Sequence, residues 1–266
     1  MLNILSNRTY RHLFMAQVIA LIGTGLATVA LGLLAYDLAG DRAGAVLGTA
    51  LAIKMSAYIL VAPVAAAFAD KFPRRTMLVT LDLVRALVAI TLPFVTQIWE
   101  IYILIFILQA ASAAFTPTFQ ASIPDILPDE REYTRALSLS RLAYDLESVI
   151  SPMLAAALLT VMSFHNLFAG TAVGFLASAA LVVSVTLPKM KALTVKRSIY
   201  DKTTRGMRIF LKTPRLRGLL ALNMAVAAAS AMVIVNTVVL VQADFGFSQR
   251  STAIALAFFG VGSMVS

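Results

Sequence analysis

Long apolar stretches alternate with short polar connections along most of the sequence. Seven of these stretches reach the roughly 20 residues that a helix needs to cross the hydrocarbon core of a bilayer. An eighth begins near Ala253 and is too short to cross before the sequence ends. The pattern predicts an all-α membrane protein, apparently truncated inside its eighth helix. The predicted spans are residues 13–36, 45–69, 77–96, 101–122, 137–163, 167–187 and 219–241.

The composition supports a membrane protein and gives no sign of an enzyme. Apolar residues make up 60% and charged residues 13% of the chain, whereas soluble domains have about 45 to 50% and about 25%. The sequence has no cysteine, and His12 and His165 are expected at opposite membrane faces. It also has no His-Glu-x-x-His, phosphate-binding glycine loop or Gly-x-Ser-x-Gly motif. We therefore expect no catalytic residue, metal or cofactor.

The basic residues predict the orientation. Eighteen of the 22 lysines and arginines fall on one side of the predicted spans, which the positive-inside rule assigns to the cytoplasm. The N-terminus is therefore expected in the cytoplasm and the protein in the inner membrane. A net charge of +9 is also typical of proteins that bind nucleic acid. Residues 188–217 alone account for this excess, so we expect no nucleic-acid partner.

One long polar connection divides the chain into three parts. We predict a six-helix transmembrane half at residues 1–187, a basic cytoplasmic linker at 188–217 and the start of a second half at 218–266. An apolar stripe at helical spacing predicts an amphipathic helix in the linker, lying on membrane lipid. A lipid sensor is one interpretation, and a tether between two halves is the other, which the modest apolar face favours. The stripe consists of Tyr200, Thr203, Met207 and Phe210.

The sequence after this linker resembles the beginning of the chain. A shift of 206 residues brings several like residues into register, and a parallel repeat of six-helix halves would produce such a pattern. On this period a complete second half needs roughly 130 to 150 further residues. The aligned pairs are Arg11 with Arg217, Leu13 with Leu219, Gln17 with Asn223, Leu34 with Leu240 and Gly40 with Gly246.

A short basic loop joins the second and third predicted spans. Residues 66–78 read AAFADKFPRRTML and resemble the loop between helices 2 and 3 of the major facilitator superfamily, Gly-x-Leu-Ala-Asp-Arg-x-Gly-Arg-Lys-x-x-Leu. Ala66 and Pro73 depart from the glycines of this pattern, while Lys71 and Arg75 keep its basic charge. The identical positions are Ala69, Asp70, Arg74 and Leu78.

The resemblance implies a secondary active transporter with a small-molecule substrate. It implies two bundles of six helices and a cytoplasmic gating loop that uses Asp70, Arg74 and Arg75. Phe106 stands where proton-coupled members often carry an arginine on helix 4. Three segments resemble the multidrug and siderophore exporters of the superfamily. They are Phe115-x-Pro117 in span 4, Ile123-Pro124-Asp125 directly after it and Leu142-Ala143-Tyr144-Asp145 in span 5.

The expected function is proton-driven efflux of a hydrophobic or amphipathic small molecule. The expected architecture is one six-helix bundle plus about one and a half further transmembrane helices. Because transport needs both halves, the missing C-terminal half would leave this chain inactive. Uptake or lipid translocation by the same fold is one alternative, and a non-transporting membrane interaction module is another.

Polar side chains at membrane depth mark the expected substrate pathway, because each is costly there unless it faces a cavity or a partner. Span 4 carries such residues at intervals of three and four, hence on one face, and span 1 has a similar set beside Gly23 and Gly25. In the superfamily these two helices line the central cavity. The alternative is hydrogen bonding between helices. The pathway candidates are Gln17, Thr24, Thr28, Gln109, Ser112 and Thr116.

Charged residues within the spans are the expected proton-coupling groups. Glu147 is expected near the midplane, with Asp145 on a neighbouring stripe of the same span and Lys54 at similar depth on span 2. A buried structural ion pair between Lys54 and Glu147 fits the sequence equally well. Asp82 and Arg85 lie one turn apart, so we expect them to pair within their own helix in a structural role.

Overall fold

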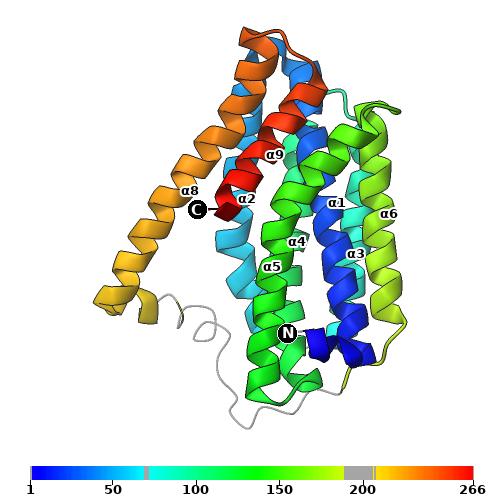
Figure 1. Cartoon of the computed structure of the whole chain (residues 1–266), viewed down its shortest axis with the longest axis vertical. Coiled ribbons are helices and arrows are strands. Elements are labelled where there is room, and N and C mark those ends of the chain that lie inside the picture. Colours follow the sequence, from blue (N-terminus) through cyan, green and yellow to red (C-terminus); the bar gives the residue numbers. More distant parts are fainter. Residues whose placement is uncertain (1, 69–71, 189–205, 207, 266) are drawn as a thin grey trace.

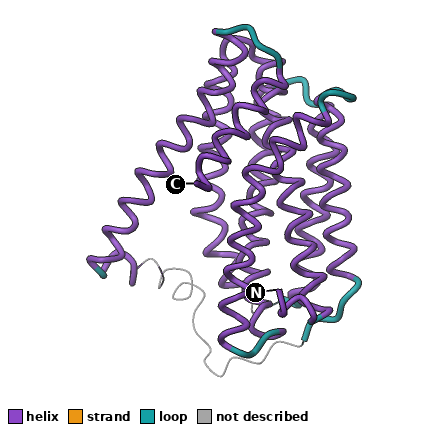
Figure 2. Tube along the Cα trace, viewed as in Figure 1, coloured by secondary structure: helices purple, strands orange, loops and turns teal. Residues whose placement is uncertain are grey.

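The computed structural model describes residues 2–68, 72–188, 206 and 208–265, which form helices and short loops with no strand among them. The helices of the N-terminal bundle run roughly along one common axis (Figures 1 and 2). The N-terminal bundle consists of α1 (Arg8–Ala39), α2 (Ala43–Phe68), α3 (Arg74–Thr91), α4 (Ile98–Ile126), α5 (Glu130–Leu158) and α6 (Phe164–Val183). Two helices follow, α8 (Pro214–Val239) and α9 (Gln249–Val265), and the short helical turns are η1 (Leu2–Ser6), η2 (Gly40–Arg42), η3 (Leu92–Phe94) and η4 (Leu240–Asp244).

The predicted spans correspond to these helices in order, and the predicted all-α membrane fold is confirmed. Within the described ranges, five segments are long and apolar enough to cross a membrane, and the first contains both α1 and α2. α5 is not among them, because Arg141, Asp145 and Glu147 interrupt its apolar run. It ends at Leu158, before the predicted end at residue 163, and packs against α1 and α9. The five segments are Arg8–Ala67, Arg74–Phe94, Ile98–Ile126, Phe164–Val183 and Pro214–Asp244.

Polar caps explain where several helices begin. The Asn7 side chain precedes α1 and accepts a hydrogen bond from the Tyr10 amide at 3.1 Å. Asp129 precedes α5 and accepts from two backbone amides at 2.9 and 3.1 Å. Before α4, the Glu100 carboxylate accepts from the Gln97 amide at 3.0 Å. Each cap supplies a hydrogen-bond acceptor for amide groups that the start of a helix leaves without a partner, and so favours a helix that begins at this point of the sequence.

The core consists of two apolar clusters separated by a polar layer. One cluster includes Leu13, Leu78 and Phe119, and the other includes Leu33 and Phe168. Along α1, α3 and α4 the residues between the two clusters include buried polar side chains. Polar groups at such a depth are retained where they face a cavity or a partner. The layer between the clusters is therefore where a functional site is expected.

Glycines let α1 approach its neighbours closely. A β-carbon at Gly174 of α6 would lie 3.6 Å from the Gly23 Cα, and the Thr171 hydroxyl donates to the Gly23 carbonyl at 3.0 Å. Gly25 is more tightly enclosed, because a β-carbon there would collide with the Glu147 carboxylate of α5. Gly23 and Gly25 thus admit close neighbours, which are helices of the same bundle.

α8 runs away from the bundle along most of its length (Figure 1). It contacts α2 and α9 near its C-terminal end, where Val238 is buried. Gly40 follows α1 with φ of 51°, and Gly246 follows η4 with φ of 64°, a conformation that favours glycine. These two glycines are aligned by the 206-residue shift, so the turn between the first two helices recurs between α8 and α9.

The predicted amphipathic linker helix lies mostly outside the described residues. Tyr200, Thr203 and Met207 are outside them, as is Asp70 of the predicted gating loop. Phe210, the last residue of the predicted stripe, lies in a helical segment at residues 208–212 and is exposed.

Candidate functional site

A polar chamber of about 190 Å³ lies within the N-terminal bundle. Its volume is well above the roughly 10–15 Å³ that one water molecule needs. Five helices, α1 to α5, contribute to its wall, and most of the lining side chains are polar or charged. The polar chamber is lined by Gln17, Ala20, Leu21, Thr24, Thr28, Lys54, Tyr58, Arg85, Ser112, Phe115, Thr116, Tyr144 and Glu147.

The structure brings most of the predicted site residues together around this chamber. Of the six pathway candidates, all except Gln109 line it, and so do Lys54 and Glu147. Asp145 does not line it: its carboxylate lies 3.3 Å from Arg141 of the same helix, and its side chain is 45% exposed. The helical stripe that contains Glu147, rather than the stripe that contains Asp145, therefore faces the chamber.

Lys54 of α2 and Glu147 of α5 face the chamber from different helices. Within the described residues, no carboxylate lies at ion-pair distance from the Lys54 ammonium. The direct ion pair that the sequence left open is therefore not formed in this conformation, and both groups remain turned toward the space between them.

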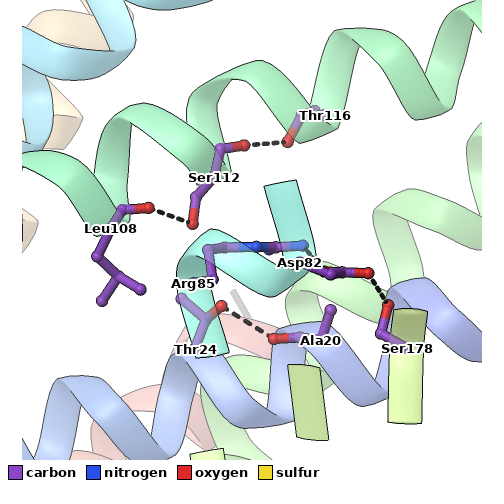
Figure 3. Close-up of polar contacts among 8 residues, drawn as sticks. All are labelled: Ala20, Thr24, Asp82, Arg85, Leu108, Ser112, Thr116 and Ser178. Atoms are coloured by element: carbon purple, nitrogen blue, oxygen red, sulfur yellow. Dashed lines mark hydrogen bonds and ion pairs between the residues drawn. The ribbon is translucent and has the colours of Figure 1, made fainter. Parts of the chain in front are cut away.

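Arg85 is the centre of a buried network on α3. Its guanidinium pairs with Asp82, whose second carboxylate oxygen accepts a hydrogen bond from Ser178 of α6 at 2.7 Å (Figure 3). The guanidinium carbon also lies 4.3 Å from the Phe115 ring centroid and 4.5 Å from that of Phe175. Cation–π contacts of this kind stabilise a desolvated arginine. The predicted Asp82–Arg85 pair is confirmed, and its arginine also lines the chamber.

Hydroxyl and amide groups connect the helices around the chamber. The Thr116 and Tyr144 hydroxyls lie 3.1 Å apart, and Ser140 donates to the Gln17 side-chain oxygen at 3.1 Å. The bonds of Ser112 and Thr116 to backbone carbonyls stay within α4 (Figure 3). Hydrogen bonding between helices and cavity lining therefore occur together, so the two interpretations of these polar stripes do not exclude each other.

Three polar or charged residues of the chamber are absent from the sequence-based prediction of the site. The sequence predicts a structural role for Arg85 and does not mark Tyr58 or Tyr144 as site residues, yet all three line the chamber. An arginine in an apolar helix is a signal for a cavity or partner, so Arg85 could have been found. Tyr144 lies one turn before Glu147 on the same face and could also have been found. Tyr58 gives no comparable signal, since a single tyrosine in an apolar span is usual.

An apolar chamber of about 40 Å³ adjoins the polar chamber, and Thr28 and Lys54 line both. α8 and α9 help to enclose it, through Val238 and Leu256 respectively. Gln109, the remaining pathway candidate, lines this second chamber, and its buried side-chain oxygen has no partner among the described residues. The apolar chamber is lined by Thr28, Val29, Leu31, Gly32, Leu33, Leu47, Ala50, Leu51, Lys54, Ile105, Gln109, Val238, Thr252 and Leu256.

The basic residues of the predicted gating loop contact the ends of neighbouring helices. Arg74 pairs with Asp125 near the end of α4 and donates to the Ala121 carbonyl. Arg75 donates to the Val183 carbonyl at the end of α6. Helix ends present unpaired carbonyl groups and partial negative charge, which favour such cations. The two arginines thus tie the start of α3 to the ends of α4 and α6.

Comparison with known proteins points to one family. A sequence model of the Major Facilitator Superfamily matches residues 13–266. The chain is 28% identical over 145 residues to the MFS-type transporter YfiS of Bacillus subtilis (54% of this chain, 34% of that protein). It is 25% identical over 154 residues to macrolide efflux protein A of Enterococcus faecalis (54% and 47%) and 28% identical over 163 residues to multidrug resistance protein MdtG of Dickeya zeae (60% and 40%). The matches therefore span less than half of these relatives.

Solved structures share the fold. A bacterial homologue of the human lysosomal transporter Spinster, in an inward-facing and unoccupied conformation, superposes with a TM-score of 0.71 at 14% identity, covering 96% of this chain and 60% of that one. A D-xylose–proton symporter gives a TM-score of 0.57 at 14% identity, with coverages of 97% and 65%. At this identity the likeness concerns the arrangement of helices and not the substrate.

Proposed function

This chain belongs to the Major Facilitator Superfamily, and we propose that it acts in secondary active transport, using a proton gradient to expel a hydrophobic or amphipathic small molecule. The family makes it a multi-pass membrane transporter and not an enzyme. Efflux is supported by the names of two relatives, a macrolide efflux protein and a multidrug resistance protein.

The observation that carries the proposal is the polar chamber between the two apolar clusters of the bundle. Charged side chains in a membrane interior are costly and persist mainly at ion or substrate pathways. Here Lys54, Arg85 and Glu147 converge on one space from three helices. In this proposal Gln17, Thr24 and the other pathway candidates form the wall along which the substrate passes.

Glu147 is the proposed proton carrier. It lies against Gly25 of α1 and lines the chamber, whereas Asp145 is engaged with Arg141 outside it. Adding a proton to Glu147 removes the charge that acts on Lys54, so protonation would change the balance of forces between α5 and α2. Such a change is what a proton-driven cycle requires, because the ion must bias one conformation over another.

Arg74 and Arg75, together with Asp70, are proposed to hold the cytoplasmic gate. Arg74 already joins α3 to Asp125 of α4. The proposal keeps the N-terminus in the cytoplasm, the protein in the inner membrane, residues 1–187 as the N-terminal half, 188–217 as the linker and 218–266 as the start of the second half. Asp70→Asn should leave membrane insertion intact and slow transport, and unchanged transport by the inserted variant would remove the gating role.

Transport by inside-out membrane vesicles tests the main proposal. Vesicles that contain the full-length protein and are made acidic inside should accumulate the amphipathic dye rhodamine B and release it when a protonophore collapses the gradient. Glu147→Gln keeps the size and hydrogen-bonding capacity of the side chain and should abolish the response to the gradient. Asp145→Asn is the matched control on the same helix and should leave the response unchanged. Full gradient-driven accumulation by a stably folded Glu147→Gln variant would refute the role of Glu147.

A further inference from the structure

The polar chamber presents one unmatched positive charge and one unmatched negative charge. Lys54 and Glu147 both line it, and within the described residues neither has a countercharge at ion-pair distance. Arg85 adds no free charge, because Asp82 neutralises it and the rings of Phe115 and Phe175 cover it. The wall of the chamber therefore carries an open pair of opposite charges.

An open pair of this kind is complementary to a ligand that carries both charges. Glu147 would attract a purely cationic ligand and Lys54 would repel it. A purely anionic ligand would be attracted by Lys54 and repelled by Glu147. A ligand with an ammonium and an acid group can satisfy both side chains at once. Buried charges are tolerated when they are paired and hydrogen-bonded, and the Tyr144 and Thr116 hydroxyls in the same wall supply hydrogen-bonding groups.

The adjoining apolar chamber indicates what the rest of the ligand is like. It shares Thr28 and Lys54 with the polar chamber, and the remainder of its wall is mostly aliphatic. A ligand head group beside Lys54 would therefore place an attached apolar body between α1, α2, α8 and α9. Burial of such a body adds affinity in proportion to its apolar area.

We propose that the substrate is an amphipathic zwitterion, with its ammonium group held by Glu147, its acid group by Lys54 and its apolar body in the apolar chamber. This inference rests on the proposed transport function and specifies its substrate class. The assignment also explains how a proton could be exchanged for the substrate, because both would bind to Glu147. A proton on Glu147 removes the charge that holds the ammonium group, so proton and substrate compete for one carboxylate.

Protonation of Glu147 depends on the charged and titratable groups that line the chamber with it. They are Lys54 and Tyr58 on α2, Arg85 on α3 and Tyr144 on α5 itself, and the chamber residues of α1 and α4 are uncharged. Competition by protons should therefore be governed by Glu147, and substrate affinity should fall as the pH is lowered through its titration.

Equilibrium binding of four eight-carbon probes to the purified full-length protein in lipid nanodiscs tests the proposal. The probes are 2-aminooctanoic acid (zwitterion), octanoate (anion), octylamine (cation) and octanol (neutral), which differ mainly in their charged groups. The zwitterion should bind at least about tenfold more tightly than each of the others, which corresponds to about 1.4 kcal/mol. Affinities of octylamine or octanoate within twofold of the zwitterion would overturn the assignment.

Variants assign the two charges. Lys54→Met should weaken binding of the zwitterion about tenfold and strengthen binding of octylamine, whereas Lys54→Arg should retain the zwitterion preference. Glu147→Gln should weaken binding of the zwitterion and strengthen binding of octanoate. If a single variant fails to fold, Lys54→Met/Glu147→Gln, which removes both charges, should bind octanol as the unmodified protein does and show no zwitterion preference. Asp145→Asn is the matched control and should leave all four affinities unchanged.

Binding and transport separate the two proposals. A zwitterion preference in nanodiscs with no gradient-driven transport in vesicles supports the substrate assignment and refutes the transport proposal. Gradient-driven transport of octanol or octylamine at the rate of the zwitterion, with equal affinities, supports transport and overturns the substrate assignment. Unchanged zwitterion affinity in a folded Lys54→Met variant also overturns it, because the acid group would then have another partner.

Discussion

α1 and α8 begin the two similar stretches of this sequence, and their surroundings differ along almost their whole length. α1 is packed against α2, α4, α5 and α6, whereas α8 contacts α2 and α9 near one end. Leu13 is 1% exposed, and its aligned residue Leu219 is 48% exposed. Both helices are apolar enough to cross a membrane. Apolar composition therefore places a helix in the membrane without determining whether lipid or protein surrounds it.

Small residues account for part of this difference. Gly23 and Gly25 let α6 and α5 approach α1, and the 206-residue shift aligns them with Ala229 and Ala231 of α8, which are exposed. Helix association in membranes depends on close packing and hydrogen bonds, because lipid is as apolar as the side chains. The contrast between the inner bundle and α8 can therefore be tested by changing packing, charge and hydrogen bonding in each.

The largest effect is expected from the buried charge pair of the inner bundle. Asp82→Asn leaves the Arg85 charge buried without its partner, which should lower the free energy of unfolding by about 3–5 kcal/mol. Arg217→Gln, at an exposed position of α8, should change it by less than about 0.5 kcal/mol. Unfolding in mixed micelles by increasing fractions of dodecyl sulfate measures both. Adding Arg85→Met to Asp82→Asn should restore stability, and failure to do so would show that the cost lies elsewhere.

Truncation of the aligned leucines compares α1 and α8 directly. Leu13→Ala opens a cavity in the inner cluster and should cost about 2 kcal/mol, at the low end for buried leucines because lipid also solvates the lost methyl groups. Leu219→Ala removes contact mainly with the surroundings of α8 and should cost less than about 0.5 kcal/mol. The same unfolding measurement applies. Equal costs would mean that α8 is packed as tightly as α1.

Addition of a methyl group at two glycines sharpens the comparison. Gly25→Ala drives a β-carbon into Glu147 and Ser151 and should cost about 1–2 kcal/mol by overpacking. Gly218→Ala meets no neighbour on α8 and should stabilise the protein by up to about 1 kcal/mol through helix propensity. Thermal unfolding monitored by circular dichroism should therefore shift in opposite directions. Shifts of the same sign would contradict the packing described for Gly25.

The smallest effect concerns one hydroxyl on each side of the comparison. The Thr171 hydroxyl proton is shared between the Gly23 carbonyl of the neighbouring helix and the Leu167 carbonyl of its own helix, both at 3.0 Å. Among the described residues, the acceptor of Thr237 lies within α8, the Val233 carbonyl at 2.7 Å. Thr171→Val should therefore cost about 0.6 kcal/mol, the average for hydrogen bonds between membrane helices. Thr237→Val should be neutral within error. A larger loss for Thr237→Val in the same unfolding assay would show a contact of α8 that this conformation does not contain.

Helix positions were predictable because membrane thickness and apolar length are directly linked. The stripe of Gln17, Thr24 and Thr28 was also predictable, since helical periodicity places these residues on one face. A buried arginine in an apolar helix also signals a cavity or a partner, but the pairing of Arg85 with Asp82 offers a sufficient local explanation, and its contact with Phe115 on another helix is visible only in the structure. Periodicity separates Asp145 from Glu147 but cannot say which stripe faces inward, since that depends on where α1 packs.

The Asp82–Arg85 pair has a consequence for the order of events during synthesis. Its two charges lie on one turn of α3, so this helix carries its own countercharge as it enters the lipid from the ribosome-bound translocon. Lys54 and Glu147 lie on helices separated by α3 and α4 in the chain. α2 therefore enters the membrane with a lysine that has no countercharge on its own helix, at an insertion cost of up to about 2.5–3.5 kcal/mol. The Glu147 carboxylate joins Lys54 in the wall of the same chamber only once α5 has been made.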